Sequence, residues 1–368
     1  MRMVCVRFIV LLFIPTLLLV ASCTEEEKVS DADVLQEVTL PDDIPSLIEM
    51  LGEPQQVNQN EIIDKLAGMG QEAVPALIEA MGDGDPMLTR AQLALSRIGP
   101  SAVPALIEAL QNDNYSIRYG AIKALKDIGP DAIDAVEPLK SHFQRATKNE
   151  QIAIMHALRD ISPTSDVISL IRASLMVEDL RWYAMRVLGD IGPDASSAIP
   201  SILPYLEHED TQTRVETIQS LAGIGIGEGV VEGIAGRLQD EESRVRQEAA
   251  QALGRFGPDG VAATNALVRA LDDDEPGVQR AAAHSLGLIA PASEGAIDDL
   301  VDALAALEDP QARRETAWAL GRFGALAGSA VPALERVAES DEYGYIRDEA
   351  LEAIRLIEGT ESGETVTE

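Results

Sequence analysis

Apolar residues recur at helical spacing along most of this chain, in two short phrases that alternate. The first phrase is AVPALIEAL in residues 102–110, where Val103, Leu106, Ile107 and Leu110 fall at positions i, i+3, i+4 and i+7. This spacing places the four side chains in one stripe and predicts an amphipathic helix. The proline that follows Val103 fits the first turn, where its missing N–H would have no partner inside the helix.

The second phrase predicts another helix, with a defined end. It reads RYGAIKALKDIG in residues 118–129, and Ala121, Leu125 and Ile128 again lie on one face. Gly129 supplies the left-handed turn that ends a helix, and the proline after it prevents the helix from continuing. One unit is therefore a pair of helices.

About ten such units follow one another along the chain. Their closing positions are spaced 29 to 34 residues apart, a period typical of solenoids. We therefore predict an all-α fold, an α-solenoid of about ten two-helix repeats. Strong copies of the second phrase occupy residues 118–129, 181–192, 214–225, 246–257 and 313–324, and weaker copies end at Gly70, Gly99, Ser162, Ala290 and Glu358.

The turn between units varies in length by about three residues. Its short form is GPSAVP and its long form is GPDASSAIP. Because three residues are close to one helical turn, we expect the longer form to add a turn before the next helix. Ser101, Asp131 and Asp194 follow the closing glycines and are expected to cap the helices that come next.

The order of AVPALIEAL, an Asp-bearing turn and the pattern R..A..AL..IGP resembles HEAT repeats of the phycobilisome-lyase-like type. The resemblance covers about residues 42–359. It implies a right-handed superhelix in which the first helices form the convex side and the second helices line a concave face. Such a stack needs polar ends, and the last unit, RDEALEAIRLIEG in residues 347–359, is expected to be charged on its free side.

The N-terminal segment is predicted to be a lipoprotein signal peptide. Arg2 and Arg7 precede the apolar run FIVLLFIPTLLLV, which is too short to span a bilayer and suits the core of a signal peptide. The run ends in Val-Ala-Ser-Cys, which resembles the bacterial lipobox; the resemblance implies cleavage before Cys23 and acylation of Cys23, for example with palmitate. The alternative is an ordinary signal peptide or a retained anchor in which Cys23 has no such role. The predicted domains are the signal peptide at 1–22, an acidic tether at 23–41, the solenoid at 42–359 and a disordered acidic tail at 360–368.

The predicted localisation of the protein is the bacterial cell envelope. The residue after Cys23 is Thr24 rather than Asp, which by resemblance to sorted lipoproteins favours the outer membrane of a two-membrane cell. Several acyl chains on one residue would hold the protein stably at a membrane. The formal net charge of −33 repels phosphate backbones, so nucleic acid is not an expected partner. We expect a monomer.

An arginine opens the second helix in six of the ten units. One interpretation is an anion-binding ladder. The interpretation that we favour is structural: each guanidinium pairs with an acidic turn residue such as Asp113, Asp210 or Asp240 and ties neighbouring units together. The ladder consists of Arg118, Arg181, Arg214, Arg246, Arg313 and Arg347.

The positions one and five residues after the start of the second helix point away from the apolar stripe and are predicted to face the concave side. They hold both tryptophans of the chain and several bases, which are residue types enriched in binding hot spots. The alternative is a solvated row of long side chains that cover the helix below. The predicted partner-binding residues are Tyr119, Lys123, His156, Trp182, Arg186, Arg280, His284, Arg314 and Trp318.

No catalytic or metal-binding motif stands out. The four histidines lie in different units without ligand spacing, and the single His-Glu pair, His208-Glu209, cannot complete a two-iron site. DDDEPG at 272–277 lacks the acidic residue that a calcium loop requires six positions beyond its glycine. We therefore expect no cofactor and no metal.

The predicted function is that of a non-catalytic, membrane-tethered scaffold that binds a protein or peptide along the concave face. Trp182 and Trp318 would anchor the partner, and Arg186, Arg280 and Arg314 would pair with its acidic groups. The alternative is a HEAT-like enzyme or accessory factor, similar to bilin lyases or metal-dependent hydroxylases, that acts on a chromophore- or metal-bearing protein.

Overall fold

The computed structural model describes residues 40–53 and 58–359. The described helices belong to one compact unit that begins at Asp42. The predicted signal peptide with Cys23, nearly all of the tether and the predicted tail lie outside the described residues, so those predictions remain predictions. The described part contains helices and no strand.

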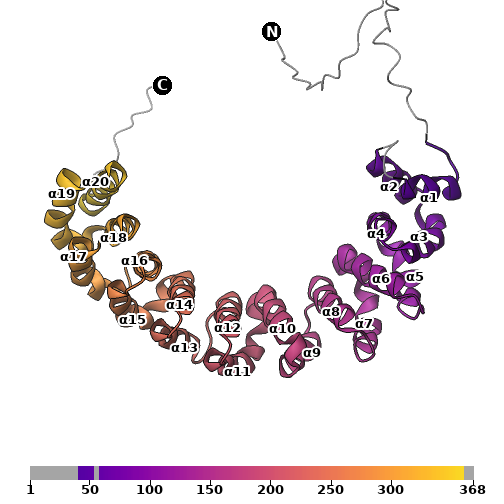
Figure 1. Cartoon of the computed structure of the whole chain (residues 1–368), viewed down its shortest axis with the longest axis horizontal. Coiled ribbons are helices and arrows are strands. Elements are labelled where there is room, and N and C mark those ends of the chain that lie inside the picture. Colours follow the sequence, from indigo (N-terminus) through magenta and orange to yellow (C-terminus); the bar gives the residue numbers. More distant parts are fainter. Residues whose placement is uncertain (1–39, 54–57, 360–368) are drawn as a thin grey trace, which may run out of the picture. The chain divides into compact units, whose positions relative to one another are not determined.

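In the described part of this unit, ten helix pairs follow one another in chain order (Figure 1). The odd-numbered helices lie on the outer side of the arc and the even-numbered helices on its inner side (Figure 1). We call them the outer and the inner helices. The outer helices are α1 (Ile44–Gly52), α3 (Val74–Ala80), α5 (Val103–Ala109), α7 (Val136–Phe143), α9 (Ser165–Ala173), α11 (Ile199–Ile202), α13 (Val230–Gly236), α15 (Thr264–Arg269), α17 (Ile297–Ala306) and α19 (Val331–Ser340).

Each inner helix packs against its own outer helix and against the inner helices of the neighbouring pairs. This arrangement confirms the predicted all-α solenoid and its ten two-helix repeats. The inner helices are α2 (Gln59–Gly68), α4 (Met87–Ile98), α6 (Tyr115–Ile128), α8 (Lys148–Ile161), α10 (Glu178–Ile191), α12 (Thr211–Ile224), α14 (Ser243–Arg255), α16 (Pro276–Ile289), α18 (Pro310–Arg322) and α20 (Gly344–Glu358).

The core consists of the apolar stripes of successive pairs. Leu106 and Leu110 of the first phrase, and Ala121 and Leu125 of the second, are fully buried. Since a single pair would leave these stripes in water, each pair depends on its neighbours for burial. None of the described helices has the length and apolar character needed to cross a membrane.

Seven of the nine described turns between pairs contain 3-10 helix, and the turns after α8 and α12 do not. Gly129, which ends α6, has φ of 69°, a conformation that favours glycine. The short turn after α4 is a 3-10 segment at Gly99–Ala102, and the long turn after α10 is one at Gly192–Ala198. The three additional residues therefore form an extra 3-10 turn.

The predicted helix caps are wrong. Ser101, Asp131 and Asp194 lie inside 3-10 segments, and their side chains accept no capping hydrogen bond. The reason is that the 3-10 turn leads directly into the next helix. The backbone N–H of Val103, for example, already donates to the carbonyl of Pro100.

Inner helices in the C-terminal part of the stack approach each other closely at glycines. A Cβ atom on Gly254 would lie 3.0 Å from Cα of Ser285 in the next inner helix, and one on Gly287 would lie 2.9 Å from Cα of Ala319. The same close approach occurs at Gly189 and Gly321. These glycines let neighbouring inner helices pack backbone against backbone.

The last inner helix was expected to be charged on its free side, and the structure agrees only in part. α20 carries Asp348, Glu352 and Arg355 on its surface, but Leu351 is 44% exposed and Leu356 is 50% exposed. The end of the described stack is therefore partly apolar.

Candidate functional site

Ladder arginines tie each turn to the inner helix that follows and to the next pair. Nη1 of Arg214 donates to the carbonyl oxygens of His208 (2.9 Å) and Glu209 (3.2 Å) in its own turn. Nη2 of Arg214 donates to the Asp240 carboxylate of the next pair at 2.8 Å. Both side chains of this ion pair are buried.

The other ladder arginines repeat parts of this arrangement. The guanidinium of Arg181 lies over the ring of Tyr205 and donates to a backbone carbonyl of its own turn. Gln151 and Gln279 occupy the same register in α8 and α16 and also donate to the preceding turn. The ion pairs to the next pair are Arg118–Glu150, Arg246–Asp273 and Arg313–Asp341, while Arg347 donates to the carbonyls of Asp341 and Glu342.

Two of the acidic partners named from the sequence have other roles. Arg118 binds the backbone carbonyl of Asp113 rather than its carboxylate. The Asp210 carboxylate accepts from the backbone N–H of Thr213 at 2.7 Å and caps α12. In each case the turn backbone is nearer to the guanidinium than the acidic side chain is.

The nine predicted partner-binding residues all belong to inner helices. Tyr119 stacks on Tyr115 at 5.7 Å between ring centroids. Lys123 in α6 and His156 in α8 are half-buried, and burial lowers the pKa of His156. The remaining six, in α10, α16 and α18, form more extensive contacts.

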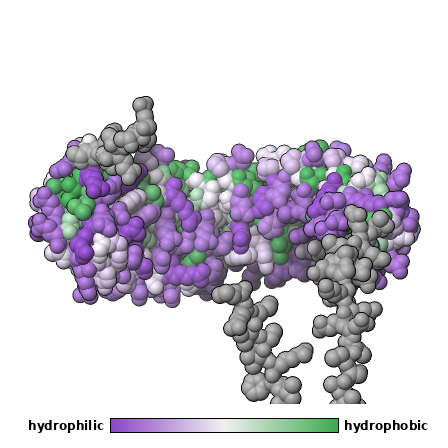
Figure 2. All heavy atoms as spheres, turned by 90° about the horizontal axis from the view of Figure 1, so that it is seen from above, coloured by the Kyte–Doolittle hydropathy of each residue, from purple (hydrophilic) through white to green (hydrophobic). Residues whose placement is uncertain are grey.

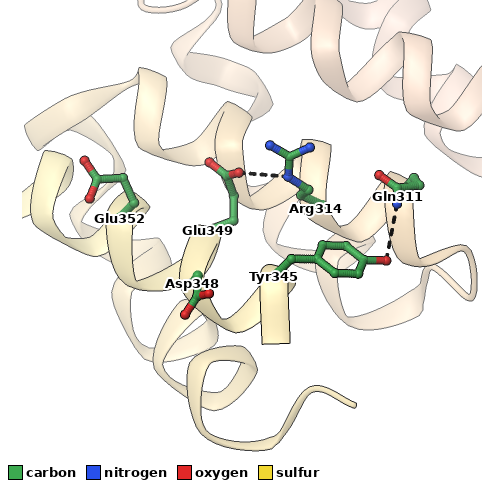
Figure 3. Close-up of a pocket in the computed structure, with 6 residues that line it drawn as sticks. All are labelled: Gln311, Arg314, Tyr345, Asp348, Glu349 and Glu352. Carbon is green, nitrogen blue, oxygen red and sulfur yellow. Dashed lines mark hydrogen bonds and ion pairs between the residues drawn. The ribbon is translucent and has the colours of Figure 1, made fainter. Parts of the chain in front are cut away.

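Three of these six are already paired with carboxylates of the chain itself. Nε of Arg314 lies 3.0 Å from a Glu349 carboxylate oxygen (Figure 3), and Nδ1 of His284 lies 2.9 Å from Glu315. Arg280 lies 3.5 Å from Asp309. Arg280 and Arg314 therefore already have acidic neighbours within the chain, and their pairing with acidic groups of a partner stays a prediction.

Trp182 is held at the boundary between α10 and α12. Its indole lies near the carboxylate of Glu216, a residue that is only 5% exposed. Burial raises the pKa of Glu216, and the Arg186 charge and the indole N–H of Trp182 oppose this shift. The guanidinium of Arg186 lies over the Trp182 ring, 5.5 Å from its centroid.

Trp318 occupies a similar setting in α18. Its ring stacks on His284 with centroids 4.7 Å apart and planes inclined by 11°. It packs against Gly287, where a Cβ atom would lie 2.5 Å from Cζ3 of the indole. The guanidinium of Arg322 lies over the ring at 5.8 Å. Sequence analysis missed Arg322, although its place four residues after a tryptophan matches that of Arg186.

The N-terminal inner helices are tied by charges instead of glycine contacts. Lys126 of α6 lies 3.4 Å from Asp160 of α8. Arg159 of α8 in turn lies 2.6 Å from Asp190 of α10. These ties join consecutive inner helices along the concave side.

Three open pockets lie in a row over the C-terminal inner helices, and every lining residue belongs to an inner helix. Their volumes are about 320, 510 and 480 Å³ in chain order. The first two share Arg255 and the last two share Gln311, so the pockets form one continuous surface from α10 to α20. We call this surface the groove. Figure 3 shows the pocket at its α20 end.

The groove is polar. It includes Arg186, Arg280, His284 and Arg314 among the predicted residues. Seen from above the view of Figure 1, the surface is mainly hydrophilic with small, separate hydrophobic areas (Figure 2). A partner would therefore be recognised mainly through hydrogen bonds and charges.

Charge is segregated between the two sides of the solenoid. Of the 26 Lys and Arg residues in the described part, 20 lie on inner helices, together with 15 Asp and Glu residues. The outer helices and turns of the same part hold the other 6 bases and 38 acidic residues. The acidic character of the protein thus resides outside the inner helices.

Within the described residues, no group of three or more His, Cys, Asp or Glu side chains is arranged to hold a metal ion. His142 is buried and lies 3.4 Å from Glu150, which also binds Arg118. Burial lowers the pKa of His142. Asp273 of the DDDEPG turn pairs with Arg246.

The stacked helix pairs and their concave groove define an all-α solenoid. Within it, residues 90–159, 199–287, 231–309 and 264–355 match HEAT repeats, which together make up more than half of the chain. The protein belongs to the HEAT-repeat family.

Solved structures support the same fold. A structure that describes Kap95p binding to RanGDP matches with a TM-score of 0.62 and 16% identity over 88% of this chain and 50% of that chain. A Kap95–Nup1 complex matches with a TM-score of 0.58 and 15% identity, over 85% of this chain and 50% of that chain. A structure of importin beta matches with a TM-score of 0.56 and 14% identity, over 85% of this chain and 52% of that chain. This chain thus spans about half the length of the chains in these solved structures. No curated protein matches it in sequence.

Proposed function

We propose that this protein is a non-catalytic scaffold that binds a protein or peptide partner along the groove and is tethered to a bacterial membrane. The observation that carries the binding role is the continuity of the three pockets, which are lined by inner helices alone. The solved HEAT-repeat structures include complexes with protein partners, such as Kap95 with Nup1 and Kap121p with Ste12p. This supports the proposal by analogy of fold.

The membrane tether is proposed from the sequence of the N-terminal segment. The short apolar run followed by Val-Ala-Ser-Cys favours cleavage and acylation at Cys23, and Thr24 favours the outer membrane of a two-membrane envelope. We further assign the repeats to the phycobilisome-lyase-like type, on the phrases AVPALIEAL and R..A..AL..IGP, without a catalytic role.

The tether is tested by a Cys23→Ala variant expressed in a bacterial host with labelled palmitate. We expect the natural chain to incorporate label and to partition into detergent, and the variant to lose both properties. A Cys5→Ala variant is the matched control and should behave like the natural chain. Equal labelling of the natural chain and the Cys23 variant would contradict the assignment.

The binding role is tested by affinity capture from envelope extracts. A Trp182→Ala/Trp318→Ala double variant is expected to lose the proteins that the natural chain retains, because the Trp182 ring supports Arg186 of the groove and the Trp318 ring stacks on His284 of the groove. An Arg172→Ala/Arg269→Ala variant on the outer helices is the control, and far-UV circular dichroism verifies that each variant is folded. Capture of the same proteins by all three chains would refute groove binding.

A further inference from the structure

Met176 is an exposed methionine in the segment that connects α9 to α10, at a position where other pairs carry an acidic residue. Met176 is 80% exposed, and Val177 beside it is 49% exposed. Arg181 follows Met176 by five residues, and each of the other five ladder arginines follows an acidic residue at the same spacing. These acidic residues are Asp113, Glu209, Glu241, Glu308 and Glu342. The apolar surface is therefore particular to this pair and is not a property of the repeat.

Val177 departs from the repeat as well, because it occupies the N-cap of α10 and its side chain forms no capping hydrogen bond. Asn114 and Asp210 hold the same position before α6 and α12, and the side chain of each accepts a hydrogen bond from the first turn of its helix. A polar residue at position 177 would therefore stabilise the start of α10. An apolar cap without a structural benefit points to a contact that covers it.

An open pocket of about 590 Å³ lies beside Met176. Met176, Pro204 and Tyr205 line it, and Glu207 and Glu209 complete the lining on the polar side. The lining residues belong to α11 or to the segments that connect α9 to α10 and α11 to α12, so none of them lies on an inner helix. The pocket is therefore separate from the groove. We call it the Met176 pocket.

The Met176 pocket combines a fixed aromatic wall with an adaptable apolar one. The hydroxyl of Tyr205 donates to the carbonyl of Leu175 at 2.9 Å, and the guanidinium of Arg181 lies 5.1 Å from the centroid of the Tyr205 ring. A ring that is already fixed loses little rotamer entropy when a ligand binds. The unbranched side chain of Met176, by contrast, adapts to apolar groups of different shape.

The two connecting segments at the pocket are acidic. Residues 174–179 and 207–210 contain five carboxylates and no lysine or arginine. Asp179 and Glu207 are paired with bases of the chain, and Asp210 caps α12. Two of the five carboxylates are therefore left to be placed.

These two are Glu178 and Glu209, and both are available to a ligand. Neither forms an ion pair within the described part of the chain. Glu209 lines the pocket, and Glu178 is exposed next to Val177. Arg181 also forms no ion pair, but its Nε donates to the carbonyl of Leu175 and it does not line the pocket. The available charge at the pocket is therefore negative, and the acidic outer helices and turns add to it.

We propose that the Met176 pocket is a second interaction surface, which docks a basic segment of a partner protein that carries one large apolar side chain flanked by lysines or arginines. The apolar side chain enters between Met176 and Tyr205 and covers Val177. The flanking basic side chains pair with Glu178 and Glu209. This surface lies outside the groove and does not depend on the function proposed for the groove.

The test uses the full chain in non-ionic detergent and three labelled peptides, GSKKLKKSG, GSKKSKKSG and GSEELEESG, with binding followed by fluorescence anisotropy. We expect the lysine–leucine peptide to bind about tenfold more tightly than the lysine–serine peptide, which corresponds to about 1.4 kcal/mol for its leucine. It should also bind at least about tenfold more tightly than the glutamate peptide. A leucine that adds no affinity, or equal binding of the glutamate peptide, would overturn the inference.

Two variants locate the apolar contact. Met176→Ser/Val177→Asn removes the apolar surface and supplies a capping side chain, so its thermal midpoint should equal or exceed that of the natural chain. This variant should bind the lysine–leucine and lysine–serine peptides equally. Ile133→Ser removes another exposed apolar side chain, one that is 54% exposed in the turn after α6, and should keep the tenfold difference. A tenfold difference that survives in the double variant would refute the assignment to this pocket.

A second pair of variants tests the charge. Glu209→Gln should weaken binding of the lysine–leucine peptide about threefold. Glu308→Gln, at the same register beside another ladder arginine, should leave it unchanged. Equal effects of the two substitutions would show that the basic residues are not recognised at this pocket.

Sedimentation of the natural chain distinguishes a partner protein from a second copy of the same chain. We expect the chain to stay monomeric as its concentration rises. A dimer that the Met176→Ser/Val177→Asn variant fails to form would assign the pocket to self-association and overturn the inference. None of these outcomes bears on the groove, because the pocket contains no groove residue.

Discussion

At the scale of single residues, the position of an arginine along its helix determines what it does. Arginines at the start of inner helices donate their N–H groups to turn carbonyls and to carboxylates of the next pair, as Arg214 does to the carbonyl of His208 and to Asp240. Arginines farther along the helix reach the groove, and only some of these are paired. The same residue type is therefore structural at one register and available for binding at another.

Arg214→Gln is expected to destabilise the protein by about 3 kcal/mol, because it removes the close partner of the buried Asp240 carboxylate and leaves only Arg237, at 3.8 Å, as a basic neighbour. The shift is measured as a lower urea midpoint by circular dichroism. Arg355→Gln removes an exposed pair with Glu352 and is the matched control, expected within about 0.5 kcal/mol of the natural chain. Equal effects of the two substitutions would contradict the structural role of the ladder.

Glu216 makes stability depend on pH in a defined direction. Because burial raises its pKa in the folded state, the native protein binds more protons than the unfolded chain above the ordinary glutamate value of about 4.3. The contribution of Glu216 to stability therefore falls as pH rises through this window and stays low above it.

Glu216→Gln removes this titration and keeps an acceptor for the Trp182 N–H. We expect the variant to gain stability relative to the natural chain as pH increases from about 4 to 8. Urea midpoints of both chains at several pH values measure the difference. A difference that does not change with pH would show that Glu216 titrates as it does in the unfolded chain.

At the scale of helices, consecutive inner helices are joined in two ways. Charged ties such as Lys126–Asp160 and Arg159–Asp190 join the N-terminal ones. In the C-terminal ones, glycines permit close backbone contact in addition to charged ties such as Arg314–Glu349. Buried hydroxyls strengthen the close contacts: Ser285 Oγ in α16 donates to the carbonyl of Ala250 in α14 at 2.7 Å.

Gly287→Ala tests the close contact between α16 and α18. The added Cβ would lie 2.5 Å from Cζ3 of Trp318 and 2.9 Å from Cα of Ala319, so the helices must move apart. We expect a loss of about 1–3 kcal/mol, despite the higher helix propensity of alanine.

Gly236→Ala is the control for this substitution, since a Cβ atom there meets nothing within 4 Å. It should leave stability unchanged or raise it by up to about 1 kcal/mol. Thermal unfolding compares the two variants, and a Gly287 variant as stable as the Gly236 variant would show that α16 and α18 do not need the contact.

The helices and their pairing were predictable because they depend on local spacing. The stripe of Val103, Leu106 and Leu110 and the positive φ of Gly129 act within a single unit. The pairing of Arg314 with Glu349 was not predictable, because it depends on which side chain of the next unit comes within reach. The burial of Glu216 and the role of Arg322 depend in the same way on contacts between units.

At the scale of the whole molecule, the net charge of −33 gives an incomplete picture of the surface. The acidic residues are concentrated on outer helices and turns, and the inner helices carry a small excess of bases. From composition alone, a basic partner would be expected for this protein. The groove itself is lined by four arginines and six carboxylates, so the excess of bases on the inner helices does not reverse that expectation there.

The ties between inner helices also have a mechanical consequence. Each tie joins only adjacent helix pairs. A pulling or bending load on the stack is therefore shared as a small rotation at each contact, or joint, between neighbouring pairs. Where a glycine contact and a charged tie occur together, as between α18 and α20, the joint has both backbone contact and a side-chain tie. We expect such a joint to resist rotation more than one held by charged side chains without a glycine contact, as between α6 and α8.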